Sequence, residues 1–183
     1  MVKAIAAGLT FWMPVRGIRE RWSKGLIRLL YGFDVRRRAK KVGVCLHCNG
    51  RVHVTRRTEI ADHVSFNGMW ASGTGRLVIG RYLHSGEGLR IFTRNHNYNC
   101  GEAIPYDDTY IAKDVIIEDF VWIGAQVILL PGTHIGEGAV IQAGSVVHGT
   151  IPPCAIAGGN PAKVFAYRDV EHFNRLKAAG RFH

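Results

Sequence analysis

The stretch VWIGAQVILLPGTHIGEGAVIQAGSVV, residues 121–147, decides the fold class of this 183-residue chain. An aliphatic residue returns at every sixth position, and the fifth member of each hexad is small or β-branched. The aliphatic column consists of Ile111, Ile117, Ile123, Leu129, Ile135, Ile141 and Val147. A strand repeats every second residue and a helix about every 3.6 residues, so neither explains the pattern. A period of six predicts a β-helix, in which short strands stack coil upon coil around the aliphatic column.

The same rhythm runs less cleanly through the first half of the chain. Its members are Val42, Cys48, Val54, Ile60, Phe66, Ile79, Ser85 and Ile91. The rhythm breaks at residues 73–75 and again at about 93–110, and inserted segments of a solenoid form loops on one face, often the binding face. We therefore divide the chain into a basic, partly helical extension (1–41), a β-helix (42–160) with an inserted loop (about 93–110), and a C-terminal helical tail (161–183).

Basic charge is concentrated in the N-terminal extension. The chain carries a net charge of +10, and residues 1–41 hold eleven Lys and Arg against two acidic residues, a net charge of +9. Apolar residues follow one side of a predicted helix here: Ile18, Trp22, Leu26, Leu29, Leu30 and Phe33. Two interpretations stay open. The helix packs on the end or side of the solenoid, or the basic amphipathic segment lies on an anionic membrane surface.

The remaining features predict a cytoplasmic protein. The apolar run over residues 4–15 is shorter than the ~20 residues that span a bilayer, and it lacks a signal-peptide cleavage site. Four irregularly spaced cysteines suit a reducing compartment. CLHC (45–48) has no second CxxC partner, so we expect packing rather than a metal site. If the N-terminal segment binds lipid, the protein is peripheral on the inner face of the membrane.

A C-terminal helix is expected from Val170, Phe173 and Leu176, ending near Gly180.

The decisive stretch, together with IPP (151–153) and GGNPAK (158–163), resembles a known family. These motifs resemble the left-handed β-helix acyltransferases with hexapeptide repeats, and within them the branch that O-acetylates sugars and polysaccharides. The resemblance is dense over residues 91–164, looser over 42–90 and absent before 42. It implies an all-β, left-handed parallel β-helix that forms a homotrimer. It also implies acetyl-CoA as co-substrate in the groove between subunits, and no metal.

The resemblance places the chemistry on a histidine in the inserted loop. The family carries its catalytic histidine between coils, ahead of the W-I-G motif, and His96 in TRNHNYN (93–99) occupies that position. His96 would act as general base, because an imidazole is largely neutral at pH 7 yet basic enough to take a hydroxyl proton. The backbone N–H of Ala125, the residue after W-I-G, would stabilise the oxyanion. Many relatives have proline after the histidine, whereas Asn97 follows here.

Other contacts follow from the same resemblance. It assigns CoA binding to Trp122, Gly124, Ala125, Ala143 and Lys163, and acceptor binding to Asn67, Asn95 and Glu87. Lys163 would meet the CoA phosphates as a point charge, and Glu87 would orient His96. Each residue also has an ordinary interpretation, such as a solvated lysine, a flank tryptophan or an asparagine of a coil turn.

We therefore expect an acetyl-CoA-dependent acetyltransferase that acts on a sugar hydroxyl of a surface polysaccharide or its precursor. N-acetylation of a nucleotide-linked amino sugar is the nearest alternative, since the same histidine would serve an amine. A γ-class carbonic anhydrase shares the fold but needs three zinc-binding histidines with an H-x4-H pair, and the chain has no such pair. Nucleic-acid binding through RRRAKK (36–41) is disfavoured, because few aromatic residues are available there for base stacking.

Overall fold

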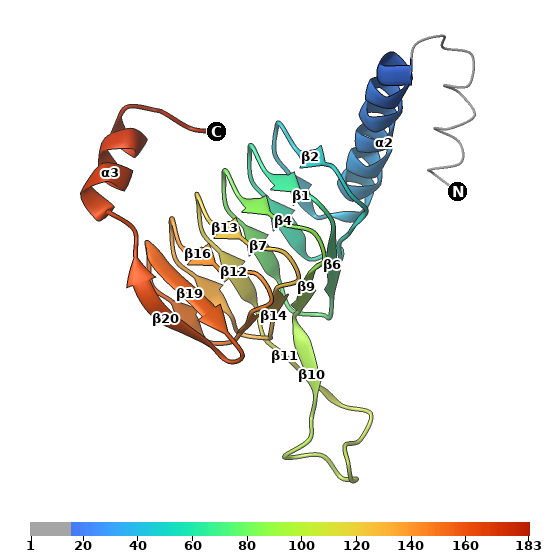
Figure 1. The fold of residues 1–183 in the computed structure, drawn as a ribbon. Helices are drawn as coiled ribbons and strands as arrows, with labels where there is room; N and C mark the ends of the chain where they lie inside the picture. The colour runs from blue at the N-terminus through green and yellow to red at the C-terminus, as the bar shows by residue number, and fades with distance from the viewer. Residues whose placement is uncertain (1–15) are drawn as a thin grey trace.

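The structure is a computed structural model that describes residues 16–183, with side chains from residue 25 onward. Six coils of parallel strands stack into a three-sided column (Figure 1). Helix α2 (Arg16–Arg38) lies at the first coil, and helix α3 (Val170–Ala178) lies beside the last coils. Between them, a two-stranded hairpin projects from the column.

Each of the first five coils contributes one strand to each of three faces. The first face contains β1 (Lys41–Val42), β4 (Thr58–Ile60), β7 (Leu77–Ile79), β12 (Val115–Ile117), β15 (His134–Ile135) and β18 (Thr150–Ile151). The second contains β2 (His47–Cys48), β5 (Ser65–Phe66), β8 (His84–Ser85), β13 (Trp122–Ile123), β16 (Val140–Ile141), β19 (Ala155–Gly159) and β20 (Ala162–Tyr167). The third contains β3 (Val52–His53), β6 (Met69–Ser72), β9 (Leu89–Phe92), β14 (Ile128–Leu129) and β17 (Val146–Val147). The sixth coil contributes β18 and β19 only, and β20 extends the second face as an antiparallel strand.

The period of six sets the register between coils. On the first face Ile117 pairs with Ile79 on one side and Ile135 on the other, and on the second face Ile123 pairs with Ile141. These side chains are fully buried and form one continuous core. Most strands have only two or three residues, so a single coil could not bury enough apolar surface to fold alone. The fold class predicted from the hexads is confirmed.

One residue of the predicted aliphatic column, Ile111, does not belong to the core. Ile111 is 40% exposed and lies in β11 (Tyr110–Ala112), which pairs with β10 (Arg94–His96) in the projecting hairpin. Its partner across the hairpin is Asn95 rather than another coil residue. The aliphatic spacing continues into the insertion by coincidence, and the core resumes only at Val115 and Ile117.

The corner between the first and second faces carries a stack of aromatic rings. His63, Tyr82 and Phe120 occupy equivalent positions of successive coils and all have positive φ, which few non-glycine residues adopt. Their ring centroids are 4.7 and 5.2 Å apart with nearly parallel planes. In the next coil this position is Gly138, against which Phe173 of α3 packs. Helix α3 therefore packs against this aromatic stack.

Both ends of the column differ in detail from expectation. The N-terminal helix exists, but it packs on the coils through Tyr31, Val35 and Ala39, while Leu29 and Phe33 of the predicted apolar stripe are exposed. At the other end, the sequence pattern did not indicate β20, which pairs antiparallel with β19. Helix α3 follows, as the pattern predicted, and the structure shows Asp169 as its N-cap. No helix in the described residues is long and apolar enough to span a membrane.

Candidate active site

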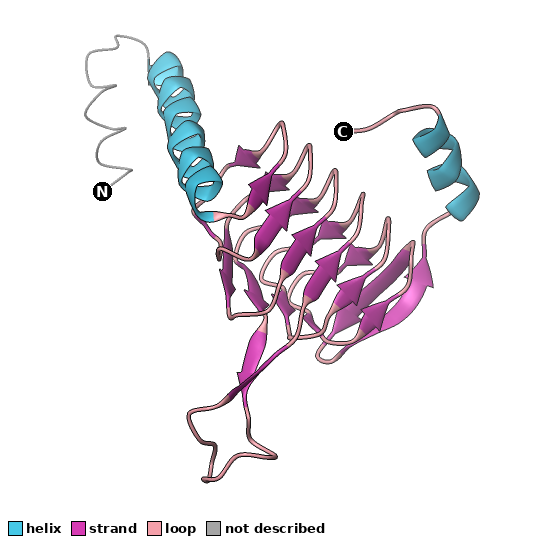
Figure 2. Ribbon diagram, turned by 180° about the vertical axis from the view of Figure 1, so that it is seen from behind, coloured by secondary structure: helices cyan, strands magenta, loops and turns pink. Residues whose placement is uncertain are grey.

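His96 ends β10 at the loop end of the hairpin ladder, and the hairpin leaves the column at the corner between the third and first faces. The insertion follows β9 of the third face and returns to β12 of the first face (Figures 1 and 2). In the β10–β11 ladder His96 lies opposite Tyr110. The histidine is therefore held on a strand, which limits its motion more than an irregular loop would.

Two tyrosines enclose the imidazole. The Tyr106 ring stacks on His96 with centroids 3.7 Å apart, and Tyr110 lies at 4.6 Å in a tilted arrangement. The Arg94 guanidinium covers Tyr110 at 4.1 Å from its centroid. The Nδ1 atom of His96 is buried and has no hydrogen-bond partner among the described residues. Burial of Nδ1 leaves Nε2 as the nitrogen available for proton transfer.

Asp107 organises the rest of the hairpin loop. Its carboxylate accepts hydrogen bonds from the backbone N–H groups of Glu102 and Thr109, both at 2.8 Å, and from the Thr109 hydroxyl. These bonds, with the Thr109 hydroxyl first, hold the pKa of Asp107 below its ordinary value. Asn97 joins the same network through its side chain, which donates to Thr109 Oγ1 at 3.1 Å. Asn97 thus ties the two sides of the hairpin together where relatives often have proline.

A second set of predicted residues lines the corner between the second and third faces. Asn67, Glu87, Ala125 and Ala143 lie there in successive coils, immediately after strands that are in register. Gly124 has a steric role, since a Cβ atom on it would lie 2.5 Å from the backbone nitrogen of Ala143. The glycine of W-I-G is therefore required for adjacent coils to approach each other.

Backbone amides at this corner are not used by the coils. The N–H groups of Glu87, Ala125 and Ala143 donate no hydrogen bond to any described residue, whereas the Ala125 carbonyl accepts from Gly144 at 2.8 Å. Ala143 is exposed and Ala125 is half-buried. Because adjacent strands are about 4.8 Å apart, these amides form a row along the column. Such a row could bind a carbonyl oxygen or the amides of an extended ligand.

The other predicted residues lie elsewhere. The Asn67 side chain is engaged with the coils, donating to the Ser85 carbonyl at 3.0 Å and accepting from Asn49 at 2.8 Å. Asn95 is exposed on β10, and Lys163 is exposed on β20 opposite Gly158. Trp122 is 56% exposed on β13 and lines a cavity of about 380 Å³ between the second face and α3.

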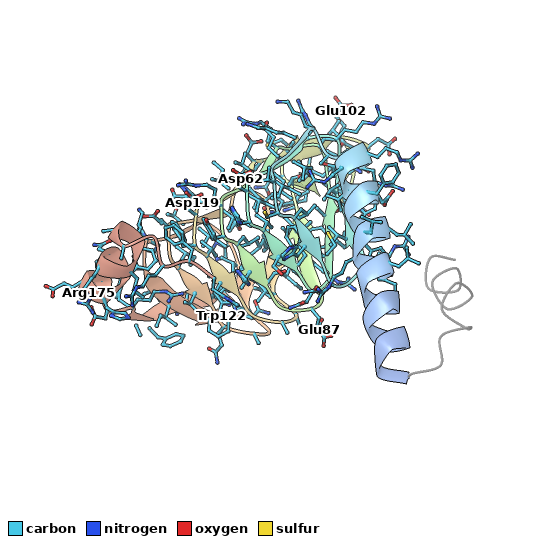
Figure 3. All side chains as sticks on the ribbon, turned by 90° about the horizontal axis from the view of Figure 1, so that it is seen from above. Asp62, Glu87, Glu102, Asp119, Trp122 and Arg175 are labelled. Carbon is cyan, nitrogen blue, oxygen red and sulfur yellow. The ribbon has the colours of Figure 1, made fainter. Side chains whose placement is uncertain are left out.

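A single chain does not bring the predicted catalytic groups together. His96 leaves the third–first corner, whereas Ala125 lies at the second–third corner, so the third face separates them. Figure 3 shows Glu87 and Trp122 on one side of the molecule and Glu102, in the hairpin loop, on the other. Trp122, assigned to CoA binding, is therefore not brought next to His96 within one subunit.

Sequence reasoning missed two residues of the hairpin loop, Tyr106 that stacks on His96 and Asp107 that organises the loop. Tyr106 and Asp107 lie ten or more positions further along an insertion without periodicity, and the only available hint was the concentration of tyrosines around TRNHNYN.

In CLHC, Cys48 is buried in the core, where desolvation raises its pKa to about 11. The described part of the chain contains no group of three or more His, Cys, Asp or Glu side chains arranged to hold a metal ion.

Comparisons with known proteins agree with the repeat and the fold. Residues 108–149 match the family described as bacterial transferase hexapeptide (six repeats). "Putative acetyltransferase YvoF" of Bacillus subtilis is 48% identical over 97 residues, which cover 48% of this chain and 56% of that protein. Chloramphenicol acetyltransferase of Klebsiella aerogenes is 33% identical over 104 residues, covering 48% of this chain and 50% of that one. The chain thus spans about half the length of the curated relatives it matches.

A solved structure extends the match over nearly the whole chain. Galactoside acetyltransferase in complex with coenzyme A superposes with a TM-score of 0.62 and 20% identity, covering 96% of this chain and 83% of that one. The fold is the left-handed parallel β-helix of such enzymes. The resemblance to the hexapeptide-repeat transferases that the sequence indicated is confirmed.

Proposed function

We propose that this protein is an acetyl-CoA-dependent O-acetyltransferase whose acceptor is a sugar hydroxyl of a surface polysaccharide or its precursor. The clamped His96 carries this proposal, because its Nδ1 is buried against tyrosines while Nε2 is left for proton transfer. A histidine held this way fits a general base better than a solvated loop residue. The matches to acetyltransferases and the free amides of the second–third corner support it.

The transfer needs one base and one oxyanion donor. His96 Nε2 removes the hydroxyl proton as the acceptor oxygen bonds to the thioester carbonyl carbon. The carbonyl oxygen becomes an oxyanion and accepts a hydrogen bond from the Ala125 N–H, a kind of interaction worth roughly 100-fold or more in rate. Collapse of this intermediate breaks the C–S bond. The CoA thiolate then takes the proton back from the His96 imidazolium.

Acetyl-CoA fits along the row of free amides. The pantetheine arm would bind from Ala125 past Ala143, whose N–H is free, toward the end of the column. Lys163 lies near that end on β20 and would meet the phosphates. Gly124 keeps the coils close enough for Ala125 and Ala143 to serve one ligand.

Assembly into a trimer would complete the site. In the proposed arrangement the hairpin of one subunit reaches the second–third corner of its neighbour, bringing His96 to Ala125 of the partner subunit. The hairpin carries apolar side chains that suit such burial, since Ile104 is 97% exposed and Tyr98 is also exposed. The proposed contacts of Glu87 and Asn95 with acceptor or base would then form across the same interface.

The test is thiol release from acetyl-CoA in the presence of free sugars, nucleotide sugars, lipid-linked sugars and amino sugars. We expect a hydroxyl acceptor to stimulate release by wild type, and His96→Ala to reduce that stimulation by ~100-fold or more. Stimulation by an amino sugar alone would show that the nucleophile is an amine rather than a hydroxyl. Equal activity of wild type and His96→Ala would contradict the assignment of the base.

A further inference from the structure

The apolar stripe of α2 faces away from the β-helix. Tyr31 and Val35 attach the helix to the first coil, and Val35 is completely buried. By contrast, Leu29 and Phe33 are 69% and 67% exposed. With about 100° of rotation per residue, both lie on the side of the helix opposite Val35. Leu29 and Phe33 therefore contribute little to packing against the other described residues.

Helix α2 also extends well past the coils. Figures 1 and 2 show it projecting from the first coil with most of its length unsupported by the column. Leu26 lies on the same line of the helix as Leu29 and Phe33, so the apolar stripe covers about two turns of the part of α2 whose side chains the structure describes. A stripe of this length on a free helix indicates a surface that binds something else.

The charge around the stripe indicates an anionic partner. Residues 1–41 carry a net charge of +9, and Arg28, Arg37 and Lys41 are exposed. Asp34 is the only acidic residue of the described part of α2 with a defined side chain, and it pairs with Arg38 at 2.9 Å. A second copy of the helix would bring two strongly positive segments together, which costs free energy. Charge complementarity therefore favours an anionic surface over self-association.

We propose that α2 lies in the plane of an anionic lipid bilayer, with Leu29 and Phe33 in the boundary between headgroups and acyl chains. Arg37, which borders the stripe, and Lys41 would meet the lipid phosphates. A helix that combines an apolar stripe with a basic flank binds such interfaces without spanning them. The β-helix would then stand on the membrane, close to a lipid-linked acceptor. This inference does not depend on the proposed acetyl transfer.

The test is co-sedimentation of the full chain with phosphatidylglycerol-containing vesicles and with pure phosphatidylcholine vesicles. We expect binding to the anionic vesicles only. Phe33→Gln should weaken it about tenfold and Leu29→Gln/Phe33→Gln about a hundredfold, because the apolar contacts with the bilayer are lost. Phe165→Gln is the matched control, since Phe165 is 63% exposed on β20 at the opposite end, and its binding should stay within about twofold of wild type.

Four outcomes would overturn the proposal, three of them in the vesicle assay itself. These are no binding by wild type, equal binding by Leu29→Gln/Phe33→Gln, and equal binding to neutral vesicles. A fourth is a lower oligomer mass of Leu29→Gln/Phe33→Gln in sedimentation velocity, which would mean that another copy of the chain covers the stripe. Because the substituted side chains are exposed, the thermal unfolding temperature of every variant should match that of wild type. This control separates a loss of vesicle binding from a loss of folding.

Discussion

Tyr106 defines how His96 can act. The stacked ring covers one face of the imidazole at 3.7 Å, and β10 fixes the histidine backbone opposite Tyr110. An imidazole restricted in this way presents Nε2 in one direction, so the proposed base would be positioned before the acceptor arrives. Such preorganisation lowers the entropic part of the activation barrier.

Removing the stacked ring should slow the reaction without preventing substrate binding. We expect Tyr106→Ala to lower kcat about tenfold with little change in KM for acetyl-CoA, because His96 gains rotational freedom. Tyr106→Phe keeps the ring and should stay close to wild type. Steady-state kinetics of both variants check this, and an equal loss in Tyr106→Phe would show that the hydroxyl rather than the stacked ring matters.

At the scale of elements, glycine sets the distance between coils. Gly124→Ala should destabilise the fold by about 1–3 kcal/mol, because its Cβ would lie 2.5 Å from the backbone nitrogen of Ala143 and the two coils must separate. Gly25→Ala is the matched control: nothing lies within 4 Å of its added Cβ, and in α2 it should be neutral or stabilising. Urea unfolding measures both. Similar free energies of unfolding for the two variants would contradict the steric role of Gly124.

The hairpin depends on the ionised form of Asp107. Its folded-state pKa lies below the ordinary value because Thr109 and the Glu102 N–H bind the carboxylate. This contribution to hairpin stability is present above the unfolded-state pKa of about 3.9 and is lost as pH falls through the lower folded-state pKa. Proteolysis or hydrogen exchange of residues 97–109 should therefore accelerate in that acidic window. Asp107→Asn should show accelerated exchange already at neutral pH, while α3 is unchanged.

At the scale of the whole molecule, His96 and Ala125 lie at different corners of one column. The proposed trimer places them together only between subunits, as in other assemblies whose sites lie at heterologous interfaces. The membrane face of α2 would lie at the first-coil end of such an assembly, leaving the last coils and Lys163 at the other.

Mixing two inactive variants tests this arrangement. His96→Ala and Ala125→Glu should each be inactive alone, the first without a base and the second with a blocked thioester site. Refolded together in equal amounts, they should recover about a quarter of wild-type activity, because one interface in four joins an intact His96 to an intact Ala125. No recovery from a mixture that forms trimers would indicate that each site is built within one chain.

The sequence alone determined the core of this protein and the segment that carries the proposed base. Hexads from Ile117 to Val147 specify the stacked coils, because every sixth residue of this stretch is aliphatic and buried in the core. The position of His96 in an insertion and the helix over 170–178 are equally local features.

Only the tertiary structure decided how these parts face one another. It turned the α2 stripe outward, exposed Ile111, stacked Tyr106 on His96 and placed Trp122 beside α3. None of these follows from a period, because each depends on where the closing of a coil or hairpin puts residues that are distant in sequence. The separation of His96 from Ala125 is the clearest case: the triangular coil assigns them to different corners, and no sequence spacing encodes that distance.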